Sequence, residues 1–267
     1  MLIIGEKINS TRKSIDRAVR DKDVDFLREE VLKQVNAGAG MLDVNCGTLE
    51  AREEPDTMKW LVKTVQDIAD IPLCIDSPNW EALAAGLSVH RGKAMINSIS
   101  GETERFKNVL PLVKQYNASV VALCMDDRGI PANKEQSLRV GVKLVSELIE
   151  AGVPVDDIYF DPLVRSVATN PETVLETLQL MEDMASKFNG LHFVSGLSNV
   201  SFGLPERRHL NRAYVVMSMA SGLDAVIVDP LDSTLMALVY ATEALLNMDR
   251  FCMQYIKQYQ QGKLKVL

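Results

Sequence analysis

Long hydrophobic runs are missing from this sequence of 267 residues, and so is an excess of positive charge. No apolar stretch approaches the roughly 18 residues that a membrane span needs. The net charge of −7 argues against nucleic-acid binding, which needs a basic face. The start, MLIIGEKINS, has a short apolar run followed by charged residues. A signal peptide needs a longer apolar segment. We therefore expect a cytoplasmic protein with no membrane or nucleic-acid partner.

Cysteine and histidine are scarce, and neither is spaced for metal binding. The four cysteines form no CxxC pair, and the three histidines are scattered along the chain. Most of the cysteines lie in or beside apolar runs, which is typical of free thiols in a reducing compartment. We expect no metal site. The residues are Cys46, Cys74, Cys124 and Cys252, with His90, His192 and His209.

Eight short runs are apolar almost throughout, as strands covered on both faces are. Longer amphipathic stretches separate most of them. In one of these, Phe26, Leu27, Val31, Leu32 and Val35 recur at helical spacing before a glycine. The predicted strands lie at 2–5, 41–45, 72–76, 94–97, 119–124, 157–161, 192–196 and 225–229, and the predicted helices at 24–37, 57–69, 136–151, 171–186, 209–221 and 232–259.

This alternation predicts the fold class α/β, with a parallel (β/α)8 TIM barrel as one domain over residues 1–267. A doubly wound open sheet is the alternative, because strand order is not written in the pattern. No GxGxxG follows the first run and no GxxxxGK occurs, which weakens the nucleotide-binding versions of an open sheet.

Polar residues stand where most predicted strands end, which is the active-site edge of such a barrel. They include almost no lysine, histidine or cysteine, so a nucleophilic triad, a Schiff base and a metal centre are all disfavoured. Carboxylates and carboxamides together suit the hydrogen-bonding edge of a flat heterocycle. The residues are Glu6, Asn9, Asp43, Asn45, Asp76, Asn97, Asp161, Ser198, Asn199 and Asp229.

Helix capping is the competing interpretation of these residues, because an aspartate at a strand end is often the N-cap of the next helix. Asp76-Ser77-Pro78 has the order of a cap followed by an N1 proline. The joint pattern over most of eight strands is harder to explain by capping alone.

The segments GEKIN, LDVN, CIDS, MINS, FDPL and GLSNVSFGLPERR resemble the pterin-binding methyltransferase family, from the first strand to about residue 255. That family includes methyltetrahydrofolate:corrinoid (iron–sulfur) protein methyltransferases and methylcobalamin:tetrahydrofolate methyltransferases. The resemblance implies a homodimeric barrel that moves a methyl group between N5 of tetrahydrofolate and the cobalt of cobalamin. The cobalamin would come on a corrinoid protein partner, since no DxHxxG motif occurs in this chain.

The resemblance also implies roles for particular residues. Asp76, Asn97 and Asp161 are similar to the groups that hold the pterin edge. Asn199 is similar to the residue that reaches the methylated nitrogen, so Asn199, Asp161 and Asp76 are the expected catalytic residues. Further pterin-pocket positions are Glu6, Ser198, Phe202 and Arg207.

Three alternatives stay open at this point. A dihydropteroate synthase-like pterin enzyme would share the carboxylates, but its seventh strand carries a lysine motif where this chain has GLSNVS. A non-catalytic folate-binding subunit of a corrinoid complex would not need Asn199 at the ring nitrogen. A barrel of unrelated chemistry would bind no folate.

Overall fold

Eight parallel strands pair in chain order and close into a barrel in the computed structural model, which describes residues 1–265. The predicted barrel is therefore confirmed, and the open sheet is wrong. Residues 266–267 of the predicted domain lie outside the described residues. The strands are β1 (Leu2–Asn9), β2 (Met41–Asn45), β3 (Leu73–Asp76), β4 (Met95–Gly101), β5 (Ser119–Asp126), β6 (Ile158–Asp161), β7 (His192–Gly196) and β8 (Ala225–Val228).

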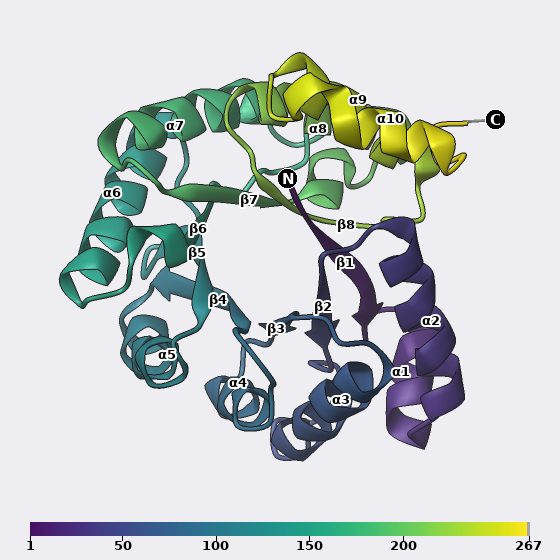
Figure 1. The fold of residues 1–267 in the computed structure, drawn as a ribbon. Helices are drawn as coiled ribbons and strands as arrows, with labels where there is room; N and C mark the ends of the chain where they lie inside the picture. The colour runs from purple at the N-terminus through teal and green to yellow at the C-terminus, as the bar shows by residue number, and fades with distance from the viewer. Residues whose placement is uncertain (266–267) are drawn as a thin grey trace.

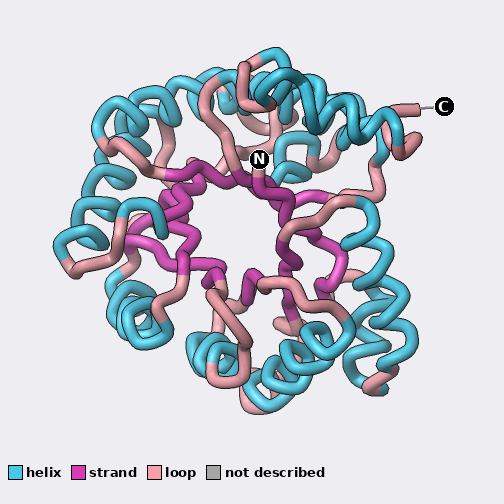
Figure 2. The backbone as a smooth tube through the Cα atoms, viewed as in Figure 1, coloured by secondary structure: helices cyan, strands magenta, loops and turns pink. Residues whose placement is uncertain are grey.

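Helices surround this ring on the outside (Figures 1 and 2). None of those in residues 1–265 is long and apolar enough to cross a membrane. They are α1 (Lys13–Asp21), α2 (Val24–Ala37), α3 (Glu54–Ile68), α4 (Trp80–Leu87), α5 (Thr103–Tyr116), α6 (Lys134–Glu150), α7 (Thr173–Lys187), α8 (Arg207–Ala220), α9 (Ser233–Leu245) and α10 (Met253–Gln260), with short 3₁₀ turns η1 (Val155–Asp157), η2 (Leu197–Ser201) and η3 (Arg250–Cys252).

The predicted helix over 232–259 is wrong as a single element. Asn247, Phe251 and Cys252 have positive φ values of 58°, 57° and 55°, which a continuous α-helix does not allow. The chain therefore leaves α9, turns through η3 and begins α10.

The capping interpretation is wrong for the strand-end aspartates. The side chains that cap α4 and α9 belong to Asn79 and Asp232, and α7 begins after Glu172. Asp76 and Asp161 lie several residues before those helices, so their carboxyl groups remain at the barrel mouth.

Alternate residues of the strands face the barrel interior, where they form a small apolar cluster, called the plug below. The larger core lies between the strands and the surrounding helices. Because the plug fills the lower part of the barrel, the polar residues nearer the strand ends rest on an apolar floor. Its buried members are Ile4, Met41, Cys74, Met95, Val121, Val194 and Ala225.

Two glycines let helices approach the strands that carry site residues. A Cβ on Gly5 would lie 2.5 Å from Oε1 of Gln34, a buried side chain that accepts the backbone N–H of Lys7. A Cβ on Gly141 in α6 would lie 2.7 Å from the ring of the fully buried Phe160 in β6. Phe160 directly precedes Asp161, so this contact fixes the end of β6.

We predict that Gly141→Ala lowers the free energy of unfolding by about 1–2 kcal/mol, because overpacking against Phe160 exceeds the gain in helix propensity. Urea unfolding followed by circular dichroism measures the change. The matched background is Phe160→Leu, in which the space is available and Gly141→Ala should be neutral or stabilising. A stabilising Gly141→Ala in the wild-type background would contradict the close approach.

Candidate active site

The ends of β2, β3 and β4 bring three polar side chains into one row. The strand register pairs Asn45 with Asp76 and Asp76 with Asn97. Asn45 Nδ2 donates to Asp76 Oδ2 over 3.0 Å. Asp76 and Asn97 line a cavity of about 710 Å³ that opens at the mouth. The structure thus brings together two of the predicted site residues and adds Asn45.

Asp43 lies beneath this row and is only 2% exposed. Its Oδ1 accepts a hydrogen bond from Asn97 Nδ2 over 3.3 Å. Burial above the plug, followed by the nearby charge of Asp76, raises the pKa of Asp43 well above its usual range. Burial likewise raises the pKa of Asp76 to about 6, although Asn45 and Arg105 oppose the rise.

Arg105 of α5 holds the loops beside Asp76 and Asn97. Its guanidinium donates to the carbonyl oxygens of Ser98, Pro78 and Ser77 at 2.8, 2.5 and 2.8 Å. These bonds connect the segment after β3 to β4. The positive charge of Arg105 lowers the pKa of Asp76.

Asp161 ends β6, and backbone groups orient its carboxyl. Its Oδ1 accepts the N–H of Leu163 over 2.8 Å, and the backbone of Gly196 forms a second hydrogen bond. Leu163 has φ of +62°, a strained value for a branched side chain. Burial raises the pKa of Asp161 to about 6 against these two bonds.

Asn199 lies in η2, directly after β7, and its side chain is exposed. Its Nδ2 lies 3.3 Å from the point where a Cβ on Gly196 would stand. The backbone of Gly196 also lowers the pKa of Asp161, so Gly196 lies beside both Asn199 and Asp161. The Asn199 amide has no intramolecular partner among the hydrogen bonds of residues 1–265, which leaves it free for a ligand.

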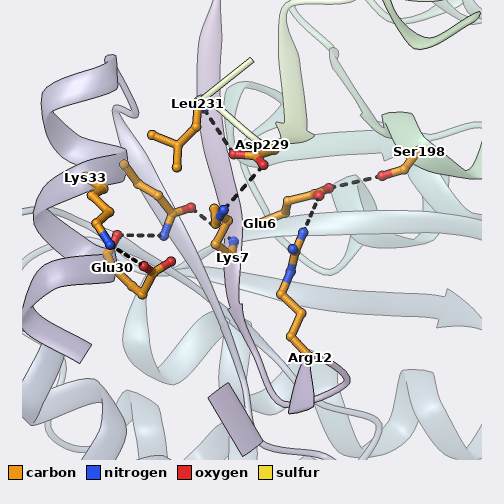
Figure 3. A network of polar contacts seen from close by, with 9 residues as sticks. Glu6, Lys7, Arg12, Glu30, Lys33, Ser198, Asp229 and Leu231 are labelled. Carbon is orange, nitrogen blue, oxygen red and sulfur yellow. Dashed lines mark hydrogen bonds and ion pairs between the residues drawn. The ribbon is translucent and has the colours of Figure 1, made fainter. Parts of the chain in front are cut away.

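Glu6 connects β1 to η2 on the other side of the mouth. It accepts from Arg12 over 2.8 Å and from the Ser198 hydroxyl over 3.1 Å, as Figure 3 shows. Arg207 donates to the Ser198 carbonyl oxygen over 2.6 Å. Burial raises the pKa of Glu6, and Arg12 opposes this rise.

These residues border a second cavity of about 530 Å³, lined by Glu6, Ser198, the arginines of α8 and the start of α9 with its N-cap Asp232. In the same region Lys7 pairs with Asp229 at 3.5 Å (Figure 3). Phe202 follows η2 and is 70% exposed, with its ring 5.9 Å from the Arg207 guanidinium. The predicted site residues are therefore divided between two sides of one mouth.

Three residues of this site were not among the expected ligand-binding positions. Asp43 and Asn45 show the strand-end pattern, but only the paired register reveals which neighbours they reach. Arg105 lies on α5, a helix that the sequence pattern did not indicate, and no motif marks it. Within residues 1–265 no cluster of three metal-binding side chains occurs.

The arrangement suits a ligand with several N–H groups on one flat edge. Asp76 and Asp161 each keep oxygen atoms that intramolecular donors do not occupy. Their pKa values of about 6 also let them hold or release a proton near neutral pH.

Comparison with known families and proteins gives a consistent result. A family model described as "Pterin binding enzyme" matches residues 5–229. A methylcorrinoid:tetrahydrofolate methyltransferase from Eubacterium limosum is 35% identical over 99% of this chain and 98% of its own length. A methionine synthase from Mycobacterium leprae is 29% identical over 85% of this chain, which spans only 20% of that longer protein.

Solved structures show the same fold at lower identity. A dihydropteroate synthase from Xanthomonas albilineans superposes with a TM-score of 0.68 at 19% identity, covering 91% of this chain and 92% of the other. One from Yersinia pestis gives 0.70 at 17% identity, covering 92% and 94%. These likenesses support the barrel architecture alone.

We predict that Asp161→Asn makes the ligand-free protein more stable above pH 6. The folded-state pKa of about 6 exceeds the ordinary 3.8, so the folded wild type loses stability as pH rises between these values. The variant carries no charge there and should gain up to about 3 kcal/mol, with no gain near pH 4. This is an upper limit, because part of Asp161 faces the open mouth.

Urea unfolding at pH 4, 6 and 8 measures this difference, and Asp70→Asn, at an exposed carboxylate, is the matched control. A constant difference between wild type and Asp161→Asn at all three values would contradict the raised pKa.

Proposed function

The chain belongs to the pterin-binding enzyme family, and we propose that it transfers a methyl group between N5 of tetrahydrofolate and the cobalt of a corrinoid protein. The observation that carries this proposal is similarity over nearly its full length to a methylcorrinoid:tetrahydrofolate methyltransferase. The polar mouth supports it, because its acids suit the amino and N–H groups of a pterin.

The pterin lies over the row formed by Asp76 and Asn97, with Asp161 on the facing strand end. A carboxylate accepts two parallel N–H bonds from an aminopyrimidine, which fixes both the position and the orientation of the ring. Glu6, Ser198, Phe202 and Arg207 form the opposite border of the pocket. The plug below keeps the ring near the strand ends, where a second substrate reaches it.

The methyl transfer is a direct displacement between nitrogen and cobalt. When tetrahydrofolate is methylated, the N5 lone pair forms the N–C bond as the Co–C bond breaks, and that bond pair stays on cobalt. N5 then carries one proton too many, which leaves to solvent through a nearby base. In the opposite direction N5 must gain a proton before it becomes a leaving group.

Asp161 and Asp76 suit this proton movement, because groups with pKa values of about 6 accept and donate at neutral pH. Asn199 contributes one hydrogen bond at N5 and carries no proton of its own to give. Such a bond accelerates the reaction where it is stronger in the transition state than in the ground state.

The corrinoid is a substrate on a separate protein. The partner brings its cobalt over the barrel mouth, in a contact expected to be transient and modest in area. A dihydropteroate synthase activity is disfavoured, because the GLSNVS segment after β7 offers no lysine for a diphosphate-bearing substrate. A non-catalytic folate-binding subunit is disfavoured by the free amide of Asn199.

The proposal includes a cytoplasmic location and a homodimer. Cys46, Cys74, Cys124 and Cys252 are all free thiols, which fits a reducing compartment. Large apolar side chains are exposed at the end of α9, in η3 and in α10, among them Leu245 at 86%, Phe251 at 79% and Met253 at 62%. The N-terminal ammonium pairs with Glu243, so this patch lies at the barrel end opposite the mouth.

We predict that Asn199→Ala lowers turnover about 100-fold while tetrahydrofolate affinity changes by less than about threefold, since one transition-state donor is lost. The assay follows methylcobalamin and tetrahydrofolate under anaerobic conditions, with the visible spectrum reporting loss of methyl-cobalt. Asn36→Ala, an exposed amide at the far end of the barrel, is the control.

Full activity of Asn199→Ala would remove its assigned role. No enzyme-dependent conversion by the wild type, together with no tetrahydrofolate binding by calorimetry, would refute the proposed function. Binding without conversion would point to the folate-binding subunit or to a strict need for the cognate corrinoid protein.

We predict a dimer in sedimentation equilibrium that the double variant Phe251→Ser, Met253→Ser converts to monomer, because it removes two exposed anchors from the apolar patch. Leu175→Ser on α7, at 60% exposure, is the matched control and should leave the dimer intact. A dimeric double variant would exclude this surface, and a monomeric wild type would exclude the homodimer.

A further inference from the structure

The amide of Asn97 has two chemically different ends, and the ligand meets a different pattern according to which end faces it. The carbonyl oxygen accepts hydrogen bonds, whereas the NH2 group donates two. An amide free to flip would present both patterns in turn and would lose part of its selectivity. Something on the protein must therefore hold the Asn97 amide in one orientation.

Asp43 makes the hydrogen bond that does so. Asn97 Nδ2 donates to Asp43 Oδ1 over 3.3 Å, and this is the side-chain hydrogen bond that Asn97 forms within residues 1–265. An Asp43 carboxyl keeps an acceptor oxygen whether or not it is protonated. The nitrogen end of the amide consequently points down to Asp43, and Asn97 Oδ1, with one remaining N–H, is left for the ligand.

Asp43 is too deeply buried to contact the ligand directly. It is 2% exposed, and its register partner on β3 is Cys74, a member of the plug. Asn45, two residues further along β2 on the same face, stands between Asp43 and the mouth. Asn45 is itself engaged with Asp76 and with Ser10, at 3.0 and 3.2 Å.

We infer that Asp43 is a positioning residue for pterin binding, which acts through Asn97 by fixing the direction of its amide. This inference rests on the proposed function, since it concerns the same pocket. It assigns a use to a buried acid that the methyl transfer does not otherwise require, and it separates Asp43 from Asp76 and Asp161, which face the ligand.

The test is a double-mutant cycle on tetrahydrofolate affinity, measured by calorimetry with the full chain. Asp43→Ala and Asn97→Ala should each weaken binding about tenfold, the usual effect of losing one buried partner. In the Asn97→Ala background, Asp43→Ala should change the affinity by less than about twofold, because its route to the ligand is gone.

Two further variants separate positioning from general loosening of the fold. Asp43→Asn keeps an acceptor oxygen of the same reach and should bind within about threefold of wild type. Asp157→Ala removes a buried carboxylate at the opposite barrel end, where it accepts from Ser119 over 3.2 Å, and should leave affinity unchanged. Thermal unfolding by circular dichroism confirms that each variant is folded.

The outcomes are distinct. Losses that add in the double variant would overturn the action of Asp43 through Asn97, as would an Asp43→Asn variant that binds as poorly as Asp43→Ala. A wild type that binds no tetrahydrofolate would refute the proposed function itself. Should Asp43→Ala fail to fold, Asp43→Leu, which removes the acceptor but fills a similar volume, takes its place in both backgrounds with the same expected tenfold and twofold changes.

Discussion

The carboxyl groups of the mouth rest on an apolar floor, and most properties of the site follow from that contact. Below Asp43 the barrel interior consists of plug residues such as Cys74, which offer no strong partner to a charge. Each acid is therefore stabilised by hydrogen bonds from a neighbouring strand or loop. Asn97 donates to Asp43, Asn45 donates to Asp76, and the backbone N–H of Leu163 donates to Asp161.

These hydrogen bonds hold the acids in place and lower their pKa values, but burial raises the pKa values by more. Asp76 and Asp161 titrate near 6 because burial outweighs their hydrogen bonds. The protein consequently carries charges in a place where they lower its own stability, which is common at functional sites. A bound pterin would supply the missing hydrogen-bond donors. The carboxylate oxygens of these acids therefore accept more hydrogen bonds in the occupied pocket than in the empty one.

The sequence was sufficient for the barrel because eight apolar runs and the helices between most of them are a strong periodic signal. It was also sufficient for Asp76, Asn97 and Asp161 as mouth residues, since strand ends share one edge. It did not indicate α1, α4 and α5. The helices α1 and α4 are short, and Pro111 lies inside α5. Without α5, Arg105 had no predicted place beside the site.

The neighbours of Asp43 could not be predicted from the sequence for a different physical reason. Its position on β2 was visible, but its neighbours depend on the stagger between strands, which no local pattern encodes. A cap and a ligand-binding acid also look alike in sequence. Only the three-dimensional result, with Asn79 and Asp232 as the capping side chains, distinguishes them.

The bond between Glu6 and Ser198 joins residues 192 positions apart, and β1 pairs with β8 beside it. The border of the pocket formed by Glu6 and Ser198 thus combines the first strand with the segment that follows β7. Contacts over such separations form late in folding, because the entropy cost of closing a long loop comes before the contacts can form. During synthesis the first strand must therefore wait, unpaired along one edge, until β8 has left the ribosome, and the pocket is completed by the same event that closes the ring.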